Sequence, residues 1–477
     1  MYPAAHRAAF SYPLHGTVVP DPYHWLEDPY SSECKAFVTA QNNAFEAFMR
    51  DSSERRGALK KRLEEAQDYA RTSCPSMRRS WYYYSHNQGL QNQAVVMRAT
   101  GLGGENEEVF FDPNALSSDG TSALSTAAWS HSDSKWAYSV SEKGSDWQKV
   151  RVRDGNTKKD FPDVIDWVKF SGISWYEDEG FFYTRYPSLR GDADKGTETD
   201  TAENPFICYH ALGTPQDADV KVLDLPDHPK WSLGAEVSDC NRYLIVSIHD
   251  GCEPNCLIWI AKIGEGGPLS GPLHFKKLIN EFVGDYNYLG NDGPVFYFST
   301  TRDAPKKKIM SMHVESREEK TLVPEQESVL SFSGLVLNTL VLCYMEHVKD
   351  VLYYSSLQDP MAQTRIHLPI GSVQTLSCRR NKSTVSVKLA SFLLPGRSYV
   401  FDICDPNGTL TVFRDDIVKG LDPDSYTTEQ VFYSSADGCK IPMFVVHHKT
   451  IERNGQNPLL LYGYGGFSLL CFPRALT

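Results

Sequence analysis

The feature that most constrains the fold of this sequence is a long central region with one repeated pattern, from about Tyr69 to about Lys419. Short runs rich in aromatic and β-branched residues alternate with turns of Asp, Asn, Gly and Ser, as in WYYYSHNQG, GFFYTRYP, RYLIVSIHDG and VFYFSTTRD. Such runs predict short strands joined by tight turns. Because no convincing long helical pattern interrupts them, we expect the region to be mainly β.

The polar turns of this region recur at a spacing that limits its architecture. Asp or Asn marks a series of turns that lie 43 to 61 residues apart: Asp133, Asp178, Asp239, Asp292, Asn338 and Asn381. One four-stranded blade of a β-propeller needs roughly 40–50 residues, so the region has room for about seven blades. A pair of β-sandwiches also uses short strands, but the length of the uniform region favours the propeller.

The N-terminal segment, residues 1–69, has a different character. Asp21 to Pro29 reads DPYHWLEDP, which is aromatic and rich in turn-forming residues. Two helical stretches follow, each with apolar residues on one face: Phe37, Val38, Phe45, Phe48 and Met49, then Leu59, Leu63 and Ala66. Because each helix has one apolar stripe, we expect both to pack against another surface.

The pattern changes again after about Lys419. TEQVFYSSADGCKIPMFVVHHK reads as two strands joined at the turn Ala436-Asp437-Gly438. NPLLLYGYGG then reads as a buried strand, Leu459 to Tyr462, that enters a glycine loop. Two outer strands followed by a core strand are one way in which an α/β-hydrolase sheet begins, and we expect this segment to be the start of such a sheet.

Charge and cysteine content bear on the partners and on the compartment. The net charge of −12 argues against binding to nucleic acid or to an anionic membrane. The eleven cysteines are scattered, and the pair Cys252 and Cys256 matches no common zinc or redox spacing. The N-terminus also lacks the apolar core of a signal peptide. We therefore expect reduced thiols, no metal site and a cytoplasmic location.

Several separated blocks of this sequence together resemble the prolyl oligopeptidase (prolyl endopeptidase) family of serine peptidases. The blocks are DPYHWLEDP, GLQNQ, GSDW, DGCKIPMFVVHHK and LYGYGGF, in the family's order and over nearly the whole chain, to about Phe467. The resemblance implies a seven-bladed β-propeller that caps an α/β-hydrolase domain and restricts access to short peptides. It also implies a serine-type endopeptidase that cleaves after proline and needs no metal or cofactor.

The resemblance divides the chain into three parts. Residues 1–69 are expected to be the N-terminal segment of the hydrolase domain, and residues 70–420 the seven-bladed propeller. Residues 421–477 are then the truncated start of the α/β-hydrolase domain, with a divergent tail at 468–477. The fold class is therefore mainly β, with an N-terminal helical segment and the first strands of an incomplete hydrolase.

The sequence lacks the signature of a serine nucleophile. A hydrolase of this kind places its Ser in a G-x-S-x-G turn and follows it with an Asp and a His. The nearest similarity, Gly466 to Leu470, lacks the second glycine, and nothing after Ser468 supplies the acid and the base. By resemblance the family's nucleophile falls beyond Thr477. We therefore predict that this chain alone has no peptidase activity.

The resemblance nevertheless implies four site residues. Tyr464, the second tyrosine of YGYGG, is expected to donate its hydroxyl to the oxyanion; the alternative is a tyrosine that packs on the loop. Phe467, Phe170 and Cys252 are expected to contact the peptide substrate, although taken alone each residue would more often belong to a core.

Two departures from the family leave the substrate preference open. Ser232 stands where well-known members carry a methionine, and His249 where they carry an arginine. Two other functions also stay open. The chain could be an interaction or regulatory propeller that associates with a full-length homologue, or the partial gene product of an active prolyl endopeptidase.

Overall fold

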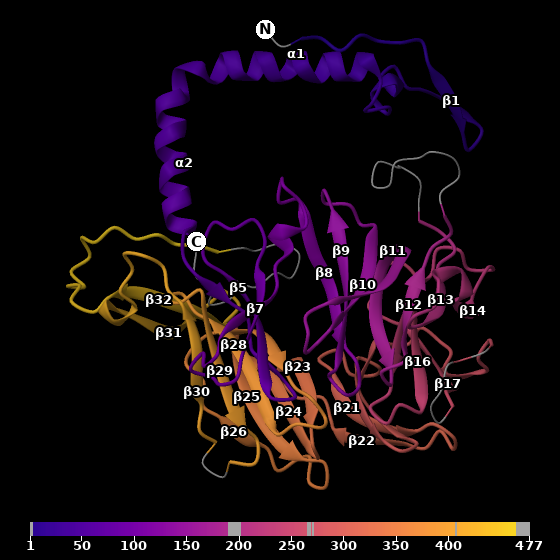
Figure 1. Ribbon diagram of the computed structural model, residues 1–477. Coiled ribbons are helices and arrows are strands. Elements are labelled where there is room, and N and C mark those ends of the chain that lie inside the picture. Colours follow the sequence, from indigo (N-terminus) through magenta and orange to yellow (C-terminus); the bar gives the residue numbers. More distant parts are fainter. Residues whose placement is uncertain (1–2, 189–201, 265–268, 270, 406–407, 464–477) are drawn as a thin grey trace. The chain divides into compact units, whose positions relative to one another are not determined.

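The computed structural model describes residues 3–188, 202–264, 269, 271–405 and 408–463 (Figure 1). The chain divides into two compact units, Met1–Gln67 and Asp68–Thr477. Each unit has its own secondary structure, helical in the first and built of strands in the second. None of the described helices has the length and the apolar composition needed to cross a membrane.

The first unit consists of a small hairpin and two helices. Its elements are β1 (Ser11–Leu14), β2 (Thr17–Pro20), η1 (His24–Leu26), α1 (Ser32–Met49), η2 (Arg50–Ser52) and α2 (Ser53–Gln67). Helix α1 begins where the Ser31 hydroxyl accepts a hydrogen bond from the backbone N–H of Cys34, which satisfies one of the free donors of the first turn.

The two helices keep their apolar stripes uncovered. Both predicted helices are confirmed, but members of the predicted stripes remain exposed: Val38, Phe45, Phe48, Leu59 and Leu63. Cys34 is the one buried residue of α1, and no described residue of α2 is buried. The packing that we predicted for these stripes is therefore not made within the first unit.

The second unit is a β-propeller, which confirms the fold predicted from the sequence and excludes a pair of sandwiches. The first blades contain β3 (Arg71–Thr72), β4 (Ser76–Arg78), β5 (Trp81–Asn87), β6 (Val95–Ala99) and β7 (Glu108–Phe111), then β8 (Ser122–Trp129), β9 (Lys135–Glu142), β10 (Gln148–Asp154), β11 (Asp160–Tyr176), β12 (Gly180–Arg185), β13 (Phe206–Ala211) and β14 (Val220–Asp224).

Four further sheets of four strands each complete the ring. They contain β15 (Ser232–Val237), β16 (Tyr243–His249), β17 (Leu257–Lys262) and β18 (Phe275–Ile279); β19 (Tyr286–Asp292), β20 (Val295–Thr300), β21 (Lys308–His313) and β22 (Glu319–Val323); β23 (Val329–Val336), β24 (Thr339–Glu346), β25 (Lys349–Ser356) and β26 (Thr364–Ile366); and β27 (Ser372–Ser377), β28 (Thr384–Ala390), β29 (Gly396–Asp402) and β30 (Thr411–Asp416).

The long strand β11 belongs to two blades. Its first half pairs with β10 and its second half with β12, and its register on β12 breaks between Val168 and Ile173. The seven-stranded sheet β8–β14 is therefore two blades joined through one strand. With this sheet counted as two, the described strands form seven blades, in agreement with the prediction.

The core of the propeller lies between neighbouring blades. One buried cluster joins Tyr243 and Ile258 of the fourth blade to Phe296 and Phe298 of the fifth. Because each sheet is covered on both faces, its middle strands are apolar almost throughout rather than alternating, as in the YLIVSIH of β16. This explains the continuous apolar runs that marked the region in the sequence.

The first and last blades meet without exchanging a strand. The Thr72 backbone N–H donates to Asp416 Oδ1 at 2.9 Å. Lys388 Nζ lies 2.5 Å from Asp416 Oδ2 and 2.7 Å from the Thr72 carbonyl oxygen. Beside this buried ion pair, the rings of Tyr84 and Phe413 contact each other with centroids 5.0 Å apart. Side-chain contacts therefore close the ring.

The antiparallel order of the strands defines two ends of the propeller. Loops between the first and second strands of the blades gather at one end, here called the turn end; they include residues 130–134, 293–294, 337–338 and 378–383. Loops between the second and third strands, and the connections between blades, gather at the other, here called the crossover end; they include residues 143–147, 225–231, 250–256 and 391–395.

The crossover end also receives the hairpin of β31 (Tyr426–Ser434) and β32 (Lys440–His448), which we predicted from the Ala436-Asp437-Gly438 turn. Gln430 of β31 accepts a hydrogen bond from Lys349 Nζ at 2.8 Å and donates to the His347 carbonyl oxygen at 2.6 Å. The rings of Phe444 and Phe392 lie 5.4 Å apart. The predicted strand over 459–462 is absent, because no described strand pairs with it and its side chains are exposed.

Candidate functional site

The described site residues predicted from the sequence both lie at the crossover end. Phe170 stands at the bend of β11 where the chain passes from the second to the third blade, and Cys252 lies in the β16–β17 loop of the fourth blade. Phe170 is 62% exposed and Cys252 is also exposed, so neither is a core residue. Tyr464 and Phe467 lie outside the described residues.

The backbone at the bend of β11 directs Phe170 away from the sheet. Trp167 and Phe170 have left-handed φ values of 59° and 50°, which few bulky residues adopt. The Trp167 N–H donates to Asp166 Oδ1 at 2.8 Å, and the Trp167 carbonyl oxygen accepts from the Tyr186 N–H at 3.0 Å. These bonds fix the break in register that ends one blade and starts the next.

The GSDW motif lies beside Phe170. Gln148 is the pairing partner of Val168, so Trp147, the residue just before β10, lies opposite Lys169 of β11. Lys169 Nζ lies 5.1 Å from the centroid of the Trp147 ring and 5.2 Å from that of Phe170. It is also 4.0 Å from Asp146 Oδ2.

Trp147 is the buried centre of this group of side chains. It is 7% exposed and meets Trp167 and Tyr186 edge to face, with centroids 5.6 Å and 6.2 Å apart. Burial raises the pKa of Tyr186 above its usual value, which is consistent with an apolar setting. We call Asp146, Trp147, Trp167, Lys169, Phe170 and Tyr186 the Phe170 cluster.

Sequence reasoning missed three members of this cluster, Trp167, Lys169 and Tyr186. A signal was present, because GSDW and VKFSG both place aromatic residues just before or after predicted strands. Only the register of β10 on β11 brings the two motifs together, and that register cannot be read from either motif alone.

The two departures from the family meet at one place on the fourth blade. Ser232 pairs with His249 at the crossover end of β15 and β16. The adjoining connection stacks His228 on Trp231, with centroids 3.5 Å apart, and Trp231 meets Phe282 at 5.5 Å. Ser232 and His249 therefore lie in one patch of the crossover end, on the blade that also carries Cys252.

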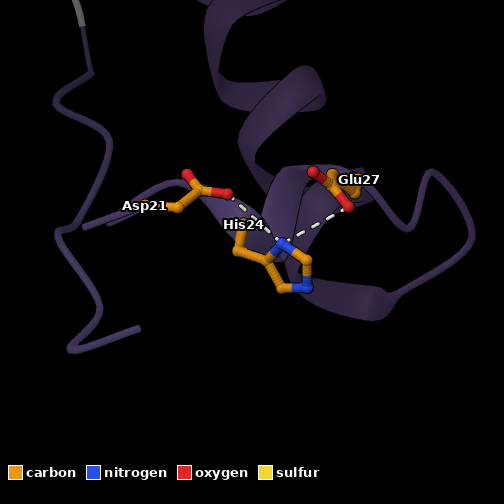
Figure 2. Close-up of side chains that lie close together, drawn as sticks. All are labelled: Asp21, His24 and Glu27. Carbon is orange, nitrogen blue, oxygen red and sulfur yellow. Dashed lines mark hydrogen bonds and ion pairs between the residues drawn. The ribbon is translucent and has the colours of Figure 1, made fainter. Parts of the chain in front are cut away.

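The DPYHWLEDP segment contains a group that could be taken for a metal site (Figure 2). His24 Nδ1 lies 3.3 Å from Asp21 Oδ2 and 3.3 Å from Glu27 Oε2. Both carboxylates face the same ring nitrogen, so one N–H at Nδ1 donates to both of them. A histidine nitrogen that binds a metal must instead carry no proton. Asp21 Oδ1 in addition accepts from the Tyr23 N–H at 3.3 Å. The group thus orders the turn before α1.

Ion pairs cross the turn end of the propeller. Asp133 of the second blade accepts from Arg78 of the first blade at 3.2 Å and from Arg379 of the seventh at 3.0 Å. Arg380 pairs with Asp292 of the fifth blade and donates to Asn338 of the sixth at 3.1 Å. The turn at 378–383 therefore connects blades on both sides of the seventh.

Comparison with known proteins agrees with this architecture. The family model of the prolyl oligopeptidase N-terminal β-propeller domain matches residues 2–414. The chain belongs to the prolyl oligopeptidase family. The resemblance seen in the sequence blocks is therefore confirmed.

Relatives of known identity extend the comparison. Prolyl oligopeptidase A of Amanita bisporigera is 34% identical over 99% of this chain and 66% of its own length. Prolyl endopeptidase of Elizabethkingia meningoseptica is 31% identical over 99% and 65%. The chain thus spans slightly less than two thirds of these prolyl oligopeptidases.

A solved structure gives the same result. Prolyl oligopeptidase B from Galerina marginata, bound to a 35mer hydrolysis and macrocyclization substrate, superposes with a TM-score of 0.85 at 29% identity. The match covers 99% of this chain and 69% of that one. The similarity extends beyond the propeller to the N-terminal unit and to the hairpin of the second unit.

Proposed function

We propose that this chain supplies the propeller of a prolyl oligopeptidase, a serine-type endopeptidase that cleaves short peptides after proline, and that the crossover end faces the peptide. The observation that carries the proposal is the exposed ring of Phe170, at the end of the propeller that also receives the β31–β32 hairpin. Cys252 at the same end is a second proposed contact. The relative that was solved with a 35mer substrate supports a peptide as the ligand.

The domain assignment follows from the same proposal. Residues 1–69 and 421–477 belong to the hydrolase part, and residues 70–420 to the propeller. The exposed apolar stripes of α1 and α2 support this assignment, because such stripes require a surface to cover them. The division between compact units falls close to the first of these boundaries, at Gln67.

Tyr464 is our proposed oxyanion donor and Phe467 a further peptide contact. A phenolic hydroxyl that points at the developing negative charge stabilises the tetrahedral intermediate. Because no charge develops without a nucleophile, Tyr464 alone gives no turnover. We therefore propose that this chain by itself binds peptide but does not hydrolyse it. No cofactor belongs to this proposal, and the free cysteines support a cytoplasmic location.

Two measurements on the purified chain test the proposal. A fluorescein-labelled peptide of eight residues with a central proline is titrated with the wild-type chain and with Phe170→Ala. We expect weaker binding to F170A. Met361→Ala is the matched control, since Met361 is also exposed and apolar but lies in the β25–β26 loop of the turn end. Equal affinity of F170A and wild type would exclude Phe170 from the peptide site.

The second measurement concerns activity. The chain is incubated with a proline-containing fluorogenic dipeptide, and we expect no turnover. Turnover that a serine-reactive phosphonate abolishes would contradict the proposal that this chain is inactive by itself. Reading the transcript beyond the codon for Phe467 would then decide whether the sequence is a partial gene product of an active endopeptidase.

A second candidate function is an interaction module that associates with a full-length homologue. The observation that favours it is the exposed apolar run Leu459, Leu460 and Leu461, which follows the hairpin in the sequence, because large exposed apolar patches mark association sites. A pull-down of a full-length prolyl oligopeptidase by this chain tests it. Failure to retain that partner above the background of an unrelated propeller would count against it.

A further inference from the structure

Lys169 connects a buried aromatic ring to an exposed one. Its side chain is 12% exposed, and its ammonium lies over the faces of Trp147 and Phe170 at nearly equal distances, 5.1 Å and 5.2 Å. Trp147 is held from its other sides by Trp167 and Tyr186. The ammonium thus joins the exposed partner, Phe170, to a packed cluster.

This arrangement has an energetic basis. An ammonium over an aromatic face gains roughly 0.5–1 kcal/mol when exposed and about 2 kcal/mol when it is desolvated. Asp146, with Oδ2 at 4.0 Å from Lys169 Nζ, adds a weak charge interaction. The contact with Trp147 is buried, and the contact with Phe170 is at the surface, so Trp147 is the anchor of the pair.

Phe170 needs such a contact because little else restrains it. Its backbone is left-handed at φ 50°, the register of β11 on β12 is broken between Val168 and Ile173, and most of its side chain is in solvent. A surface phenylalanine without a neighbour would sample several rotamers. The ammonium lies over the ring, and the 62% exposure of Phe170 leaves ring surface on which an apolar group can pack.

We propose that Lys169 is a positioning residue that holds the Phe170 ring in one orientation, so that the exposed surface of the ring can pack against a proline or another apolar residue of a bound peptide. The proposal rests on the proposed function, in which the crossover end faces the peptide. A preordered ring binds more tightly because less side-chain entropy is lost on binding, and aromatic faces are common partners of proline in peptide recognition.

The orienting role of Lys169 is tested without any ligand. 4-Fluorophenylalanine is placed at position 170 of the full chain, and its ¹⁹F resonance is recorded in the wild-type background and with Lys169→Met and Lys169→Arg. We expect K169M to shift and broaden the resonance, because the charge is lost while the length of the side chain is kept. K169R keeps a cation over the rings and should restore a sharp signal. A resonance that is identical in K169M and wild type would overturn the proposal.

A matched variant separates this effect from a general loss of structure. Lys277 also lies over a tryptophan ring, with Nζ 4.4 Å from the centroid of Trp259, but it belongs to the outer strand β18. Lys277→Met should leave the fluorine signal at position 170 unchanged. The near-ultraviolet circular dichroism and the melting temperature of K169M are recorded as well, so that an unfolded variant is recognised. If K169M is unfolded, the fluorine spectra of K169R and wild type are compared instead.

The role in peptide binding is tested with the labelled eight-residue peptide. We expect K169M to weaken binding about 3- to 10-fold, with K169R close to wild type and K277M unchanged. Weaker binding to F170A with unchanged binding to K169M would overturn the role of Lys169 and leave the proposed function standing. If wild type and F170A bind equally, the proposed function fails together with the role in binding, and the fluorine spectrum still decides whether Lys169 orders the ring.

Discussion

Arg379 on the last blade donates a hydrogen bond to Asp133 on the second blade, with 3.0 Å between Nη1 and Oδ2. The other carboxylate oxygen of Asp133 accepts from Arg78 of the first blade at 3.2 Å. Asp133 is buried, and Arg379 also approaches the carbonyl oxygen of Met77 at 3.4 Å. One carboxylate therefore links the last blade to the first two, at the seam where no strand is exchanged.

The first prediction concerns this seam. Replacing Arg379 with Met should destabilise the second unit by about 1.5–3 kcal/mol, the value typical of a lost hydrogen bond to a charged group. Arg78 still pairs with Asp133 in this variant. The loss of unfolding free energy should therefore be smaller than the loss expected when a buried charge has no partner. The measurement is the midpoint of urea unfolding, followed by tryptophan fluorescence.

Lys382→Ala is the control for Arg379. Lys382 lies in the same turn and makes none of the ion pairs found among the described residues, so its loss should change the midpoint very little. Equal effects of the two substitutions would mean that the turn, and not the Asp133 contact, sets the stability of the seam.

The second prediction compares a buried ion pair with an exposed one. Lys388→Met removes the cation that lies between Asp416 and the Thr72 carbonyl oxygen, and it leaves a buried carboxylate whose remaining partner is the Thr72 N–H. We expect a loss of about 3–5 kcal/mol and faster hydrogen exchange in β3 and β30.

The matched control is Lys419→Met. Lys419 Nζ lies 2.7 Å from Asp68 Oδ2, but the Lys419 side chain is largely exposed and that of Asp68 is partly exposed, so the loss of unfolding free energy should be below about 1 kcal/mol. If K388M and K419M reduced the free energy of unfolding equally, the buried Lys388–Asp416 pair would not be a special contributor to the closure of the ring.

The third prediction rests on a buried histidine between two carboxylates. His210 Nδ1 lies 2.6 Å from Asp219 Oδ1, and Nε2 lies 3.1 Å from Asp163 Oδ1. Both ring nitrogens therefore face carboxylate oxygens, an arrangement that favours the imidazolium with its two N–H donors. Burial lowers the pKa of His210, but the hydrogen bonds and charges of Asp219 and Asp163 outweigh it, so that the pKa is raised overall.

The sign of the pH dependence follows from this shift. The native state keeps the proton of His210 at a pH where the unfolded state, with a pKa of about 6.5, has lost it. The contribution of His210 to the free energy of unfolding is fully present below about pH 6.5. It is lost as the pH rises through the raised native pKa. His210→Gln should therefore cost about 3–5 kcal/mol at pH 6, and its difference from wild type should shrink at higher pH.

The measurement is urea unfolding of wild type and H210Q at several pH values between 6 and 9. His367→Gln is the control, because His367 is exposed and has no carboxylate partner among the described hydrogen bonds. A difference between H210Q and wild type that stays constant over this pH range would contradict a charged His210.

These sites show what the sequence could and could not reveal. The strand and turn pattern predicted the propeller because blades bury both faces, which leaves apolar runs at a regular spacing. His210 gave no signal, since its carboxylates come from Asp163 and Asp219 on other segments. Lys169 was missed for the same reason: its partner Trp147 is defined only by the register of β10 on β11.

The strand predicted at 459–462 was wrong for a related reason. Apolar β-forming residues favour a strand only where a neighbouring strand accepts their hydrogen bonds, and no described strand lies beside these residues. The prediction took the composition of Leu459 to Tyr462 as sufficient, whereas the strand needs a partner sheet.

The fourth prediction concerns this exposed run. Leu459, Leu460 and Leu461 are 87%, 84% and 78% exposed, and a contiguous apolar patch promotes self-association. The double substitution Leu459→Ser and Leu461→Ser should therefore reduce concentration-dependent self-association in sedimentation velocity and leave the melting temperature unchanged. Val164→Ser is the control, since Val164 is an exposed apolar residue on a propeller strand and such single residues are ordinary on protein surfaces. If V164S reduced association as much as the double variant, the 459–462 run would not be the association site.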